Sequence, residues 1–176
     1  QQGQGPSWAN SLFEDNAEYG YGMYIGVKKI REQLLEVAKK AVETASGELK
    51  EALEQWIEFA NLGAATRQRS ARLVAAIEAE GATTPELKEI LDKKQFLIKR
   101  SHWIFGGDGW AYDIGFGGVD HVLASGEDIN IWVFDTEVYS NTGGQSSKST
   151  HEAAVAQFAA SGKRTKKKDL GMMAMS

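Results

Sequence analysis

The chain has 176 residues, enough for one domain with a substantial core but short for a large enzyme. A net charge of −4 gives no argument for nucleic acid or a membrane surface as a partner. There is no cysteine, which excludes disulfides, thiolate catalysis and cysteine-ligated clusters within this chain, and the three histidines show no metal-ligand spacing.

Targeting and membrane signals are missing from the sequence. No apolar run reaches the length of a membrane-spanning helix, and residues 1–6 do not have the layout of a signal peptide. The polar beginning and the apolar run at 172–176 indicate a segment of a longer protein. We therefore expect no membrane partner and a cytoplasmic location.

The first hundred residues divide into a loop region and a helical stretch. Residues 1–24 are rich in glycine and aromatic residues, which predicts a cofactor-facing loop region. Residues 25–100 have apolar side chains at spacings of three and four, which predicts a structural helical insertion without chemistry of its own. A break is expected at Ser46-Gly47, and Thr84 followed by Pro85 predicts a helix start. The expected core positions are Val27, Ile30, Leu34, Val37, Ala41, Leu49, Leu53, Trp56, Ile57, Ala60, Leu73, Ala76, Ile77, Leu87, Ile90, Leu91 and Leu97.

Two short apolar runs after the insertion predict neighbouring parallel strands. The runs are 103–105 and 129–134, and the glycine-rich stretch 111–124 between them predicts a helix. This β-α-β pattern indicates an α/β fold with a parallel sheet flanked by helices. Trp103 and Trp132 are expected in its core.

A polar cluster follows each predicted strand. Gly107-Asp108-Gly109 follows the first, and residues 135–138 follow the second. Because open α/β sheets bind their ligands at the carboxyl ends of the strands, we expect the two clusters to meet. Glycine on both sides of the acid would let a phosphate approach the backbone amides.

The two clusters contain oxygens suited to a hard cation. Asp108 offers a carboxylate, Thr136 a hydroxyl and Val138 a main-chain carbonyl, and the last two lie on one turn. Magnesium takes about six oxygens and draws only some of them from protein, so a diphosphate and water would complete the shell. The sequence therefore predicts a magnesium–diphosphate site.

The remaining residues carry weaker signals. A polar loop spans 139–150, a helix is expected over 152–160, and a basic tract follows at 163–168. We interpret the tract as a solvated surface segment, since charge runs are weak indicators of a partner. It has no interleaved aromatic residues, which argues against RNA or single-stranded DNA.

The residues around both clusters resemble a known family. Gly107-Asp108-Gly109, followed a little under thirty residues later by an oxygen donor, is similar to the motif of thiamine-diphosphate enzymes, which usually have Asn where this chain has Thr136. The longer stretches 103–115, 135–145 and 5–18 resemble the C-terminal thiamine-diphosphate domain of pyruvate:ferredoxin (or flavodoxin) oxidoreductase.

The resemblance implies roles for individual residues. Residues 101–176 would form the thiamine-diphosphate- and magnesium-binding region of a thiamine-diphosphate-binding fold, with Mg²⁺ held by Asp108, Thr136 and Val138. Asn141 would be a catalytic residue beside substrate and thiazolium, because an uncharged amide can hydrogen-bond a developing alkoxide. The implied cofactor-binding residues are Gly107, Asp108, Gly109, Trp110, Thr136, Glu137, Val138, Tyr139, Ser140 and Asn141.

The resemblance also implies the activity of the whole enzyme. It would oxidatively decarboxylate pyruvate to acetyl-CoA and CO₂ in anaerobic metabolism, passing electrons through iron–sulfur clusters to ferredoxin or flavodoxin. Implied partners are pyruvate, coenzyme A, the electron carrier, the remaining domains and a second copy in a homodimer, in the cytoplasm or an anaerobic organelle. The cluster ligands and the glutamate that activates the coenzyme would lie outside this chain, so the isolated segment is expected to be inactive. Two alternatives stay open: a thiamine enzyme for another 2-oxo acid, and a non-catalytic α/β interaction segment.

Overall fold

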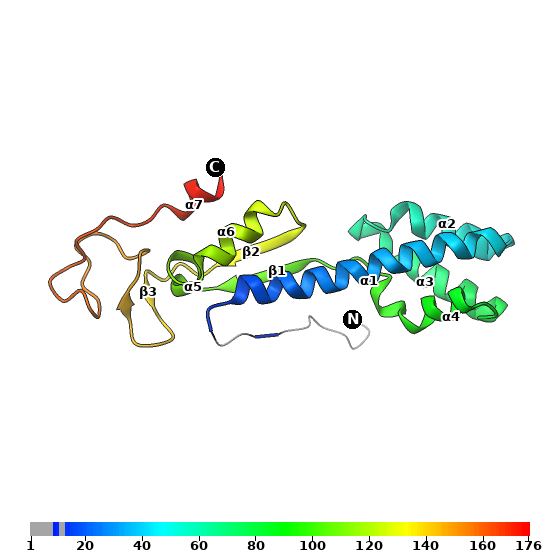
Figure 1. The fold of residues 1–176 in the computed structure, drawn as a ribbon, viewed down its shortest axis with the longest axis horizontal. Helices are drawn as coiled ribbons and strands as arrows, with labels where there is room; N and C mark the ends of the chain where they lie inside the picture. The colour runs from blue at the N-terminus through cyan, green and yellow to red at the C-terminus, as the bar shows by residue number, and fades with distance from the viewer. Residues whose placement is uncertain (1–8, 11–12) are drawn as a thin grey trace. The chain divides into compact units, whose positions relative to one another are not determined.

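A computed structural model describes residues 9–10 and 13–176 (Figure 1). The chain forms two compact units, which we name the sheet unit (Gln1–Met23 with His102–Ser176) and the helical unit (Tyr24–Ser101). Residues 1–8 and 11–12 of the predicted loop region at 1–24 lie outside the described residues.

The helical unit consists of α1 (Asn16–Thr44), whose first residues belong to the sheet unit, α2 (Gly47–Phe59), α3 (Gly63–Glu80), α4 (Pro85–Asp92) and the 3₁₀ turn η1 (Lys94–Phe96). Their apolar side chains gather on facing sides, which confirms the predicted helical pattern. The buried core comprises Leu34, Ala38, Ala41, Leu49, Ala52, Leu53, Trp56, Ala60, Leu73, Ala76, Ile77, Leu87, Ile90 and Leu97.

Local sequence signals set the helix ends in this unit. α1 ends at Thr44 and α2 begins at Gly47, so the predicted break is confirmed. The Thr84 hydroxyl accepts a hydrogen bond from the Leu87 N–H at 3.3 Å, and Pro85 opens α4, as predicted.

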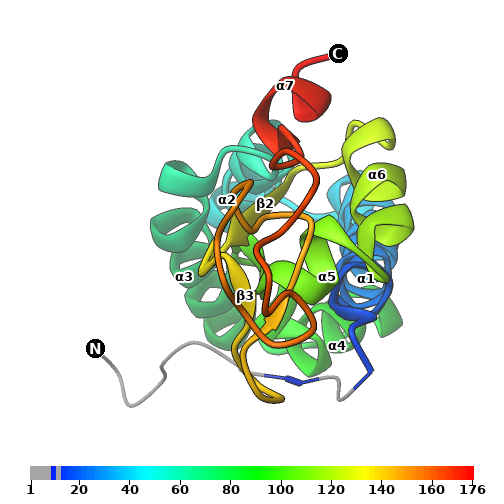
Figure 2. The same ribbon diagram turned by 90° about the vertical axis from the view of Figure 1, so that its left-hand side faces the viewer.

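The sheet unit is built around two parallel strands, β1 (His102–Gly106) and β2 (Ile129–Val133). The short helices α5 (Asp108–Tyr112) and α6 (Phe116–Ala124) connect them (Figure 1; Figure 2). The predicted α/β class and the β-α-β connection are therefore confirmed.

The connection holds two helices rather than the single one predicted over 111–124, because the chain turns sharply at 113–115. Gly115 allows this turn, since a Cβ there would lie 2.6 Å from both the Trp110 ring and the Glu14 carbonyl oxygen. The Gly115 N–H closes the turn by donating to the Gly109 carbonyl at 3.4 Å.

After β2 the chain is mostly irregular. It contains the antiparallel hairpin of β3 (Val138–Tyr139) and β4 (Gln145–Ser146), and later α7 (Leu170–Ala174). Among the helices of the described residues, none combines the length and the apolar character needed to cross a bilayer.

Residues 152–160 do not form the predicted helix. Ala153 and Phe158 have φ values of 67° and 64°, which no α-helix accommodates. The Gln157 N–H instead donates to the Gly144 carbonyl at 3.1 Å, beside the β3–β4 hairpin. Backbone pairing with the hairpin therefore overrides the helix propensity of this alanine-rich stretch.

Trp103 and Trp132 are half exposed, at 50% and 51%, so their predicted place in the core is wrong. Strand side chains alternate between faces, and Ile104 is the β1 residue that faces the core. Trp103, Phe105 and Phe134 stack in succession on the other face, with ring centroids 6.1 and 6.2 Å apart. Both faces of β1 and β2 carry apolar side chains, so the sequence pattern does not show which face of the strands is buried.

Residues 16–24, predicted as part of the loop region, form the first turns of α1. The glycines in this stretch weakened the helical signal, but Gly20 has a packing role. A Cβ at Gly20 would lie 2.6 Å from Ile104 Cγ1, so the helix backbone passes directly over that side chain.

Gly20→Ala should destabilise the sheet unit, although alanine favours helices. The added Cβ meets the buried Ile104 side chain, and overpacking of this kind costs about 1–3 kcal/mol. Gly22→Ala is the matched control, because a Cβ there meets no described atom within 4 Å. We expect it to add about 1 kcal/mol of stability through helix propensity. Urea unfolding compares the two, and equal stability would contradict the packing argument.

Candidate functional site

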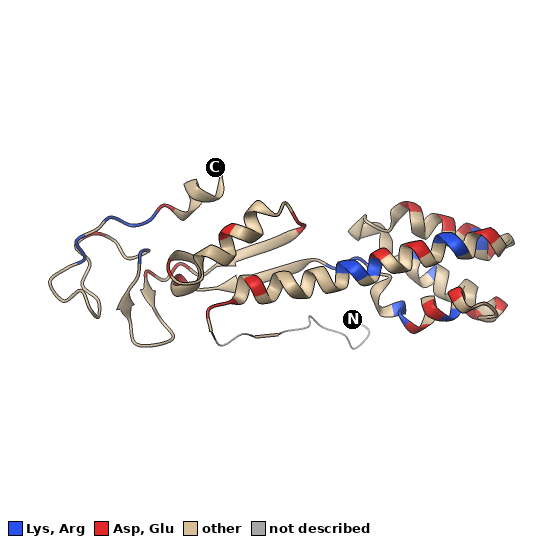
Figure 3. Ribbon diagram, viewed as in Figure 1, with Lys and Arg blue, Asp and Glu red and all other residues tan. Residues whose placement is uncertain are grey.

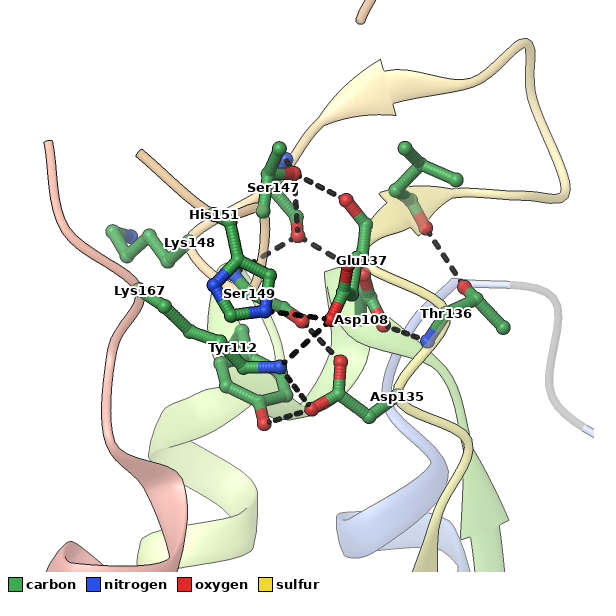
Figure 4. A network of polar contacts seen from close by, with 12 residues as sticks. Asp108, Tyr112, Asp135, Thr136, Glu137, Ser147, Lys148, Ser149, His151 and Lys167 are labelled. Atoms are coloured by element: carbon green, nitrogen blue, oxygen red, sulfur yellow. Dashed lines mark hydrogen bonds and ion pairs between the residues drawn. The ribbon is translucent and has the colours of Figure 1, made fainter. Parts of the chain in front are cut away.

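Asp108 is the first residue of α5, just past the end of β1, and its side chain is only 2% exposed. Its Oδ1 accepts a hydrogen bond from the Thr136 N–H at 3.0 Å (Figure 4). Its Oδ2 accepts one from the Ser147 hydroxyl at 3.0 Å. The carboxylate is therefore held from two sides by segments that follow β2.

Thr136 and Val138 come shortly after β2, and the backbone N–H of Thr136 contacts Asp108. Parallel pairing brings the carboxyl ends of β1 and β2 to one edge, which makes this contact possible. The Thr136 hydroxyl donates to the Val138 carbonyl oxygen at 3.1 Å (Figure 4). The three predicted ligand residues are thus linked through Thr136, while their binding of a metal stays a prediction.

Glu137 lies between these two oxygen donors in a left-handed conformation, with a φ of 65°. Such a conformation costs about 1–3 kcal/mol in a residue with a side chain, so the surroundings must enforce it. The Thr150 hydroxyl donates to the Glu137 carbonyl, and His151 Nε2 lies 3.0 Å from Glu137 Oε1 (Figure 4). These contacts hold the turn that directs the oxygens of the flanking residues.

The electrostatics of Asp108 suit a bound cation. Burial raises the pKa of its carboxyl, and the hydrogen bonds from Thr136 and Ser147 offset this only in part. A buried carboxylate becomes favourable when a positive charge compensates it, and the hard oxygens here are those that Mg²⁺ prefers. Within residues 9–10 and 13–176, the surroundings of Asp108 included, no three His, Cys, Asp or Glu side chains cluster in a way that could hold a metal, so an ion here would be held by one carboxylate together with a hydroxyl and a carbonyl oxygen. The donor set fits magnesium.

The two glycines beside Asp108 serve different structural purposes. Among the described atoms beyond its chain neighbours, a Cβ at Gly107 would have only the Phe134 carbonyl oxygen near it, 4.0 Å away, so the described part of the chain leaves the backbone approachable there. A Cβ at Gly109 would lie 2.4 Å from Tyr139 Cε1, so the Tyr139 ring packs on that backbone. The open side at Gly107 is the one that leaves room for a phosphate.

Trp110 is fully buried in the core of the sheet unit. Gly106 leaves room for its ring, because a Cβ there would lie 2.1 Å from Trp110 Cε3. The buried indole N–H has no hydrogen-bond partner within the described part of the chain. Trp110 therefore supports the site through packing, and its predicted contact with the cofactor stays a prediction.

Tyr139, Ser140 and Asn141 belong to the β3–β4 hairpin. Burial, together with a hydrogen bond to Asp113, raises the pKa of Tyr139 to about 12. The Gly144 N–H donates to the Tyr139 carbonyl at 2.9 Å and closes the hairpin turn. Ser140 and Asn141 are exposed at that turn. Their predicted roles at the cofactor, including catalysis by Asn141, stay predictions.

A second carboxylate network, around Asp135, was missed by the sequence analysis. Asp135 Oδ2 accepts hydrogen bonds from the Tyr112 hydroxyl at 2.8 Å and from Lys167 Nζ at 2.7 Å (Figure 4). Asp135 Oδ1 accepts one from the Ser149 hydroxyl. Burial disfavours the charged carboxylate, but these bonds outweigh it and lower the pKa of Asp135. Asp135 is therefore held ionised beside the candidate site.

The basic tract at 163–168 is the blue run that precedes α7 in Figure 3. Its lysines make specific contacts, so it is not simply solvated, which corrects the sequence-based interpretation. Besides the Lys167 contact, Lys168 Nζ donates to the Tyr112 carbonyl at 3.2 Å. Lys163 Nζ donates to the Thr150 carbonyl. The tract thus packs against the segments that follow β1 and β2. No local pattern signals such contacts, because their partners lie far away in the sequence.

Comparison with known proteins places this geometry in context. No family model matches the chain. It is 59% identical over 176 residues to pyruvate-flavodoxin oxidoreductase of Klebsiella pneumoniae, covering 99% of this chain and 15% of that protein. It is 54% identical over 181 residues to pyruvate:ferredoxin oxidoreductase of Moorella thermoacetica, with 99% and 16% covered. It is 50% identical over 177 residues to mitochondrial pyruvate dehydrogenase (NADP+) of Euglena gracilis, with 99% and 10% covered.

The chain thus spans between 10% and 16% of the length of these relatives. The shared names are those of pyruvate oxidoreductases, and the alignments cover nearly all of this chain. Over nearly its whole length, the chain is therefore similar to one segment of the pyruvate-flavodoxin and pyruvate:ferredoxin oxidoreductases, which confirms the resemblance carried by its motifs.

Proposed function

We propose that this chain binds the Mg²⁺–diphosphate end of thiamine diphosphate within a pyruvate:ferredoxin or pyruvate-flavodoxin oxidoreductase. The observation that carries the proposal is the contact of the buried Asp108 carboxylate with Thr136, whose hydroxyl in turn meets the Val138 carbonyl. A carboxylate bonded to the Thr136 backbone N–H and an alcohol bonded to a peptide oxygen thus follow the carboxyl ends of two parallel strands. The similarity to pyruvate oxidoreductases supports the reaction class.

Each residue of the site has a defined task in this proposal. Asp108, Thr136 and Val138 hold the magnesium ion, and the open backbone at Gly107 receives a phosphate oxygen. Trp110 and residues 137–141 line the coenzyme, with the Asn141 amide donating to a substrate oxygen. When bound, thiamine diphosphate supplies the electron sink for decarboxylating a 2-oxo acid.

The proposal extends to the whole protein. It oxidises pyruvate with coenzyme A as acetyl acceptor and passes electrons through iron–sulfur clusters to ferredoxin or flavodoxin, as a homodimer. The names of the relatives support pyruvate and the two electron carriers. Because this chain has no cysteine, cluster ligands have to come from another part of the enzyme, and the isolated chain is inactive.

Titration of thiamine diphosphate into the complete protein, with Mg²⁺ and with excess EDTA, tests the proposal. We expect the affinity to fall by about 100-fold without the metal, since charge-assisted contacts worth about 3 kcal/mol are lost. Isothermal calorimetry measures the change. An affinity for thiamine diphosphate that is the same with Mg²⁺ and with EDTA would favour the non-catalytic alternative. Metal-dependent binding in a protein that decarboxylates a different 2-oxo acid would favour the other thiamine enzyme.

A further inference from the structure

A turn of buried hydroxyl side chains lies against the candidate site. Ser147, Ser149 and Thr150 are 4%, 0% and 2% exposed. The turn is closed by the Thr150 N–H, which donates to the Ser147 carbonyl at 3.3 Å, and by the Ser149 N–H, which donates to Ser147 Oγ at 3.0 Å. We name residues 147–150 the hydroxyl turn. Burying hydroxyls is costly unless each one has a partner, so their partners indicate what the turn does.

Each buried hydroxyl of the turn donates to a different acceptor around the site (Figure 4). One acceptor belongs to the cluster after β1, and two belong to the cluster after β2. The pairs are Ser147 with the Asp108 carboxylate, Ser149 with the Asp135 carboxylate, and Thr150 with the Glu137 carbonyl. A single four-residue turn therefore ties together both oxygen clusters.

We propose that the hydroxyl turn positions the oxygens of the cation site, with Ser147 orienting the Asp108 carboxylate; this inference rests on the proposed magnesium site. Asp108 Oδ1 is fixed by the Thr136 N–H and Oδ2 by the Ser147 hydroxyl, both at 3.0 Å, so the carboxylate group cannot rotate. Each of these oxygens still has lone pairs with which to meet a cation.

At the other end of the hydroxyl turn, Thr150 contacts the backbone of Glu137, which lies between the proposed ligands Thr136 and Val138. Thr150 Oγ accepts from the Ser147 N–H at 2.9 Å and donates to the Glu137 carbonyl, which couples the two contacts. Glu137 has a left-handed φ, so Thr150 stabilises the conformation that places Thr136 and Val138. The turn thus fixes a side chain on one side of the site and a backbone on the other.

Removal of the Ser147 hydroxyl tests this role in the complete protein. We expect Ser147→Ala to raise the Mg²⁺ concentration needed for half-maximal thiamine diphosphate binding by about 10–100-fold, the range typical for partners that orient metal ligands. The electron paramagnetic resonance spectrum of Mn²⁺ bound in place of Mg²⁺ should also change, because the geometry of its carboxylate ligand changes. A purely structural hydroxyl would alter the melting temperature and leave that spectrum as it is.

Ser146→Ala is the matched control, since the backbone N–H of Ser146, which the change leaves in place, makes its contact to Gln157. It should alter neither the Mg²⁺ requirement nor the Mn²⁺ spectrum. Ser147→Cys keeps a side chain of similar size with a weaker donor and should give an intermediate Mg²⁺ requirement. It also serves as the test variant if Ser147→Ala does not fold.

The outcomes separate this inference from the proposed function. If the unmodified protein binds thiamine diphosphate with Mg²⁺ but the Ser147 variants keep its Mg²⁺ requirement and Mn²⁺ spectrum, the positioning role is overturned and the site itself stands. If the unmodified protein shows no metal-dependent binding, the proposed function fails, and the positioning role fails with it.

Discussion

We expect Asp108→Asn to lower the Mg²⁺-dependent affinity for thiamine diphosphate by more than about 100-fold, beyond the range seen when only a ligand's supporting partner is lost. The change removes the single carboxylate among the three proposed ligands and keeps the shape of the side chain. The Asn oxygen can still accept from the Thr136 N–H, and its amide can donate to the Ser147 hydroxyl, which accepts as well as donates. The fold should therefore persist.

Calorimetric titration with thiamine diphosphate at fixed Mg²⁺ measures this loss, and circular dichroism checks the fold. Asp120→Asn removes the same charge from the exposed surface of α6 and should leave the affinity unchanged. Binding by Asp108→Asn at the affinity of the unmodified protein would reject Asp108 as the metal ligand and remove the basis of the proposed function.

The largest effect on stability is expected for Trp56→Ala in the helical unit. Trp56 is 1% exposed, and its indole N–H donates to the Leu97 carbonyl at 3.1 Å. Truncation leaves a cavity among the packed helices, which costs about 3–5 kcal/mol for a buried aromatic side chain. Urea unfolding followed by far-ultraviolet circular dichroism measures the loss. A change below about 0.5 kcal/mol, typical of surface positions, would show that Trp56 is not central to this core.

Trp56→Phe separates packing from hydrogen bonding at the same position. Phenylalanine retains much of the buried apolar area but leaves the Leu97 carbonyl without its donor, which costs about 1–3 kcal/mol. The loss for Trp56→Phe should therefore be smaller than for Trp56→Ala. Equal losses would assign the whole effect to the hydrogen bond.

The helical unit was predictable because its signals are local. Leu34, Leu53 and Ile90 lie in three different helices, each on an apolar face with helical periodicity, and all three are fully buried. The cap at Thr84 uses a side chain and a backbone group three residues apart, so it too can be read from the sequence. The start of α1 was missed because Gly20 is present for its contact with Ile104, a distant residue.

The adjacency of the two polar clusters was also predictable, since parallel strands bring their carboxyl ends together. Asp108 and Thr136 lie beside each other for this reason, although 28 residues separate them. The prediction of a helix over 152–160 was wrong because backbone pairing of Gln157 with the β3–β4 hairpin outweighs the local helix propensity. The role of Lys167 could not be predicted, because neither periodicity nor a motif relates it to Asp135.

The contacts of the basic tract have a consequence for the order of assembly. Lys167 reaches back 32 residues to Asp135, and Lys168 reaches back 56 residues to Tyr112. Contacts between residues so distant in sequence carry a loop-closure cost and form late in folding. On the ribosome, the strand pair β1–β2 and helices α1 to α6 can be made well before either lysine emerges. The contacts of Asp135 with Lys167 and of Tyr112 with Lys168, which lie next to the candidate site, therefore form only after the strands and helices around that site have been synthesised.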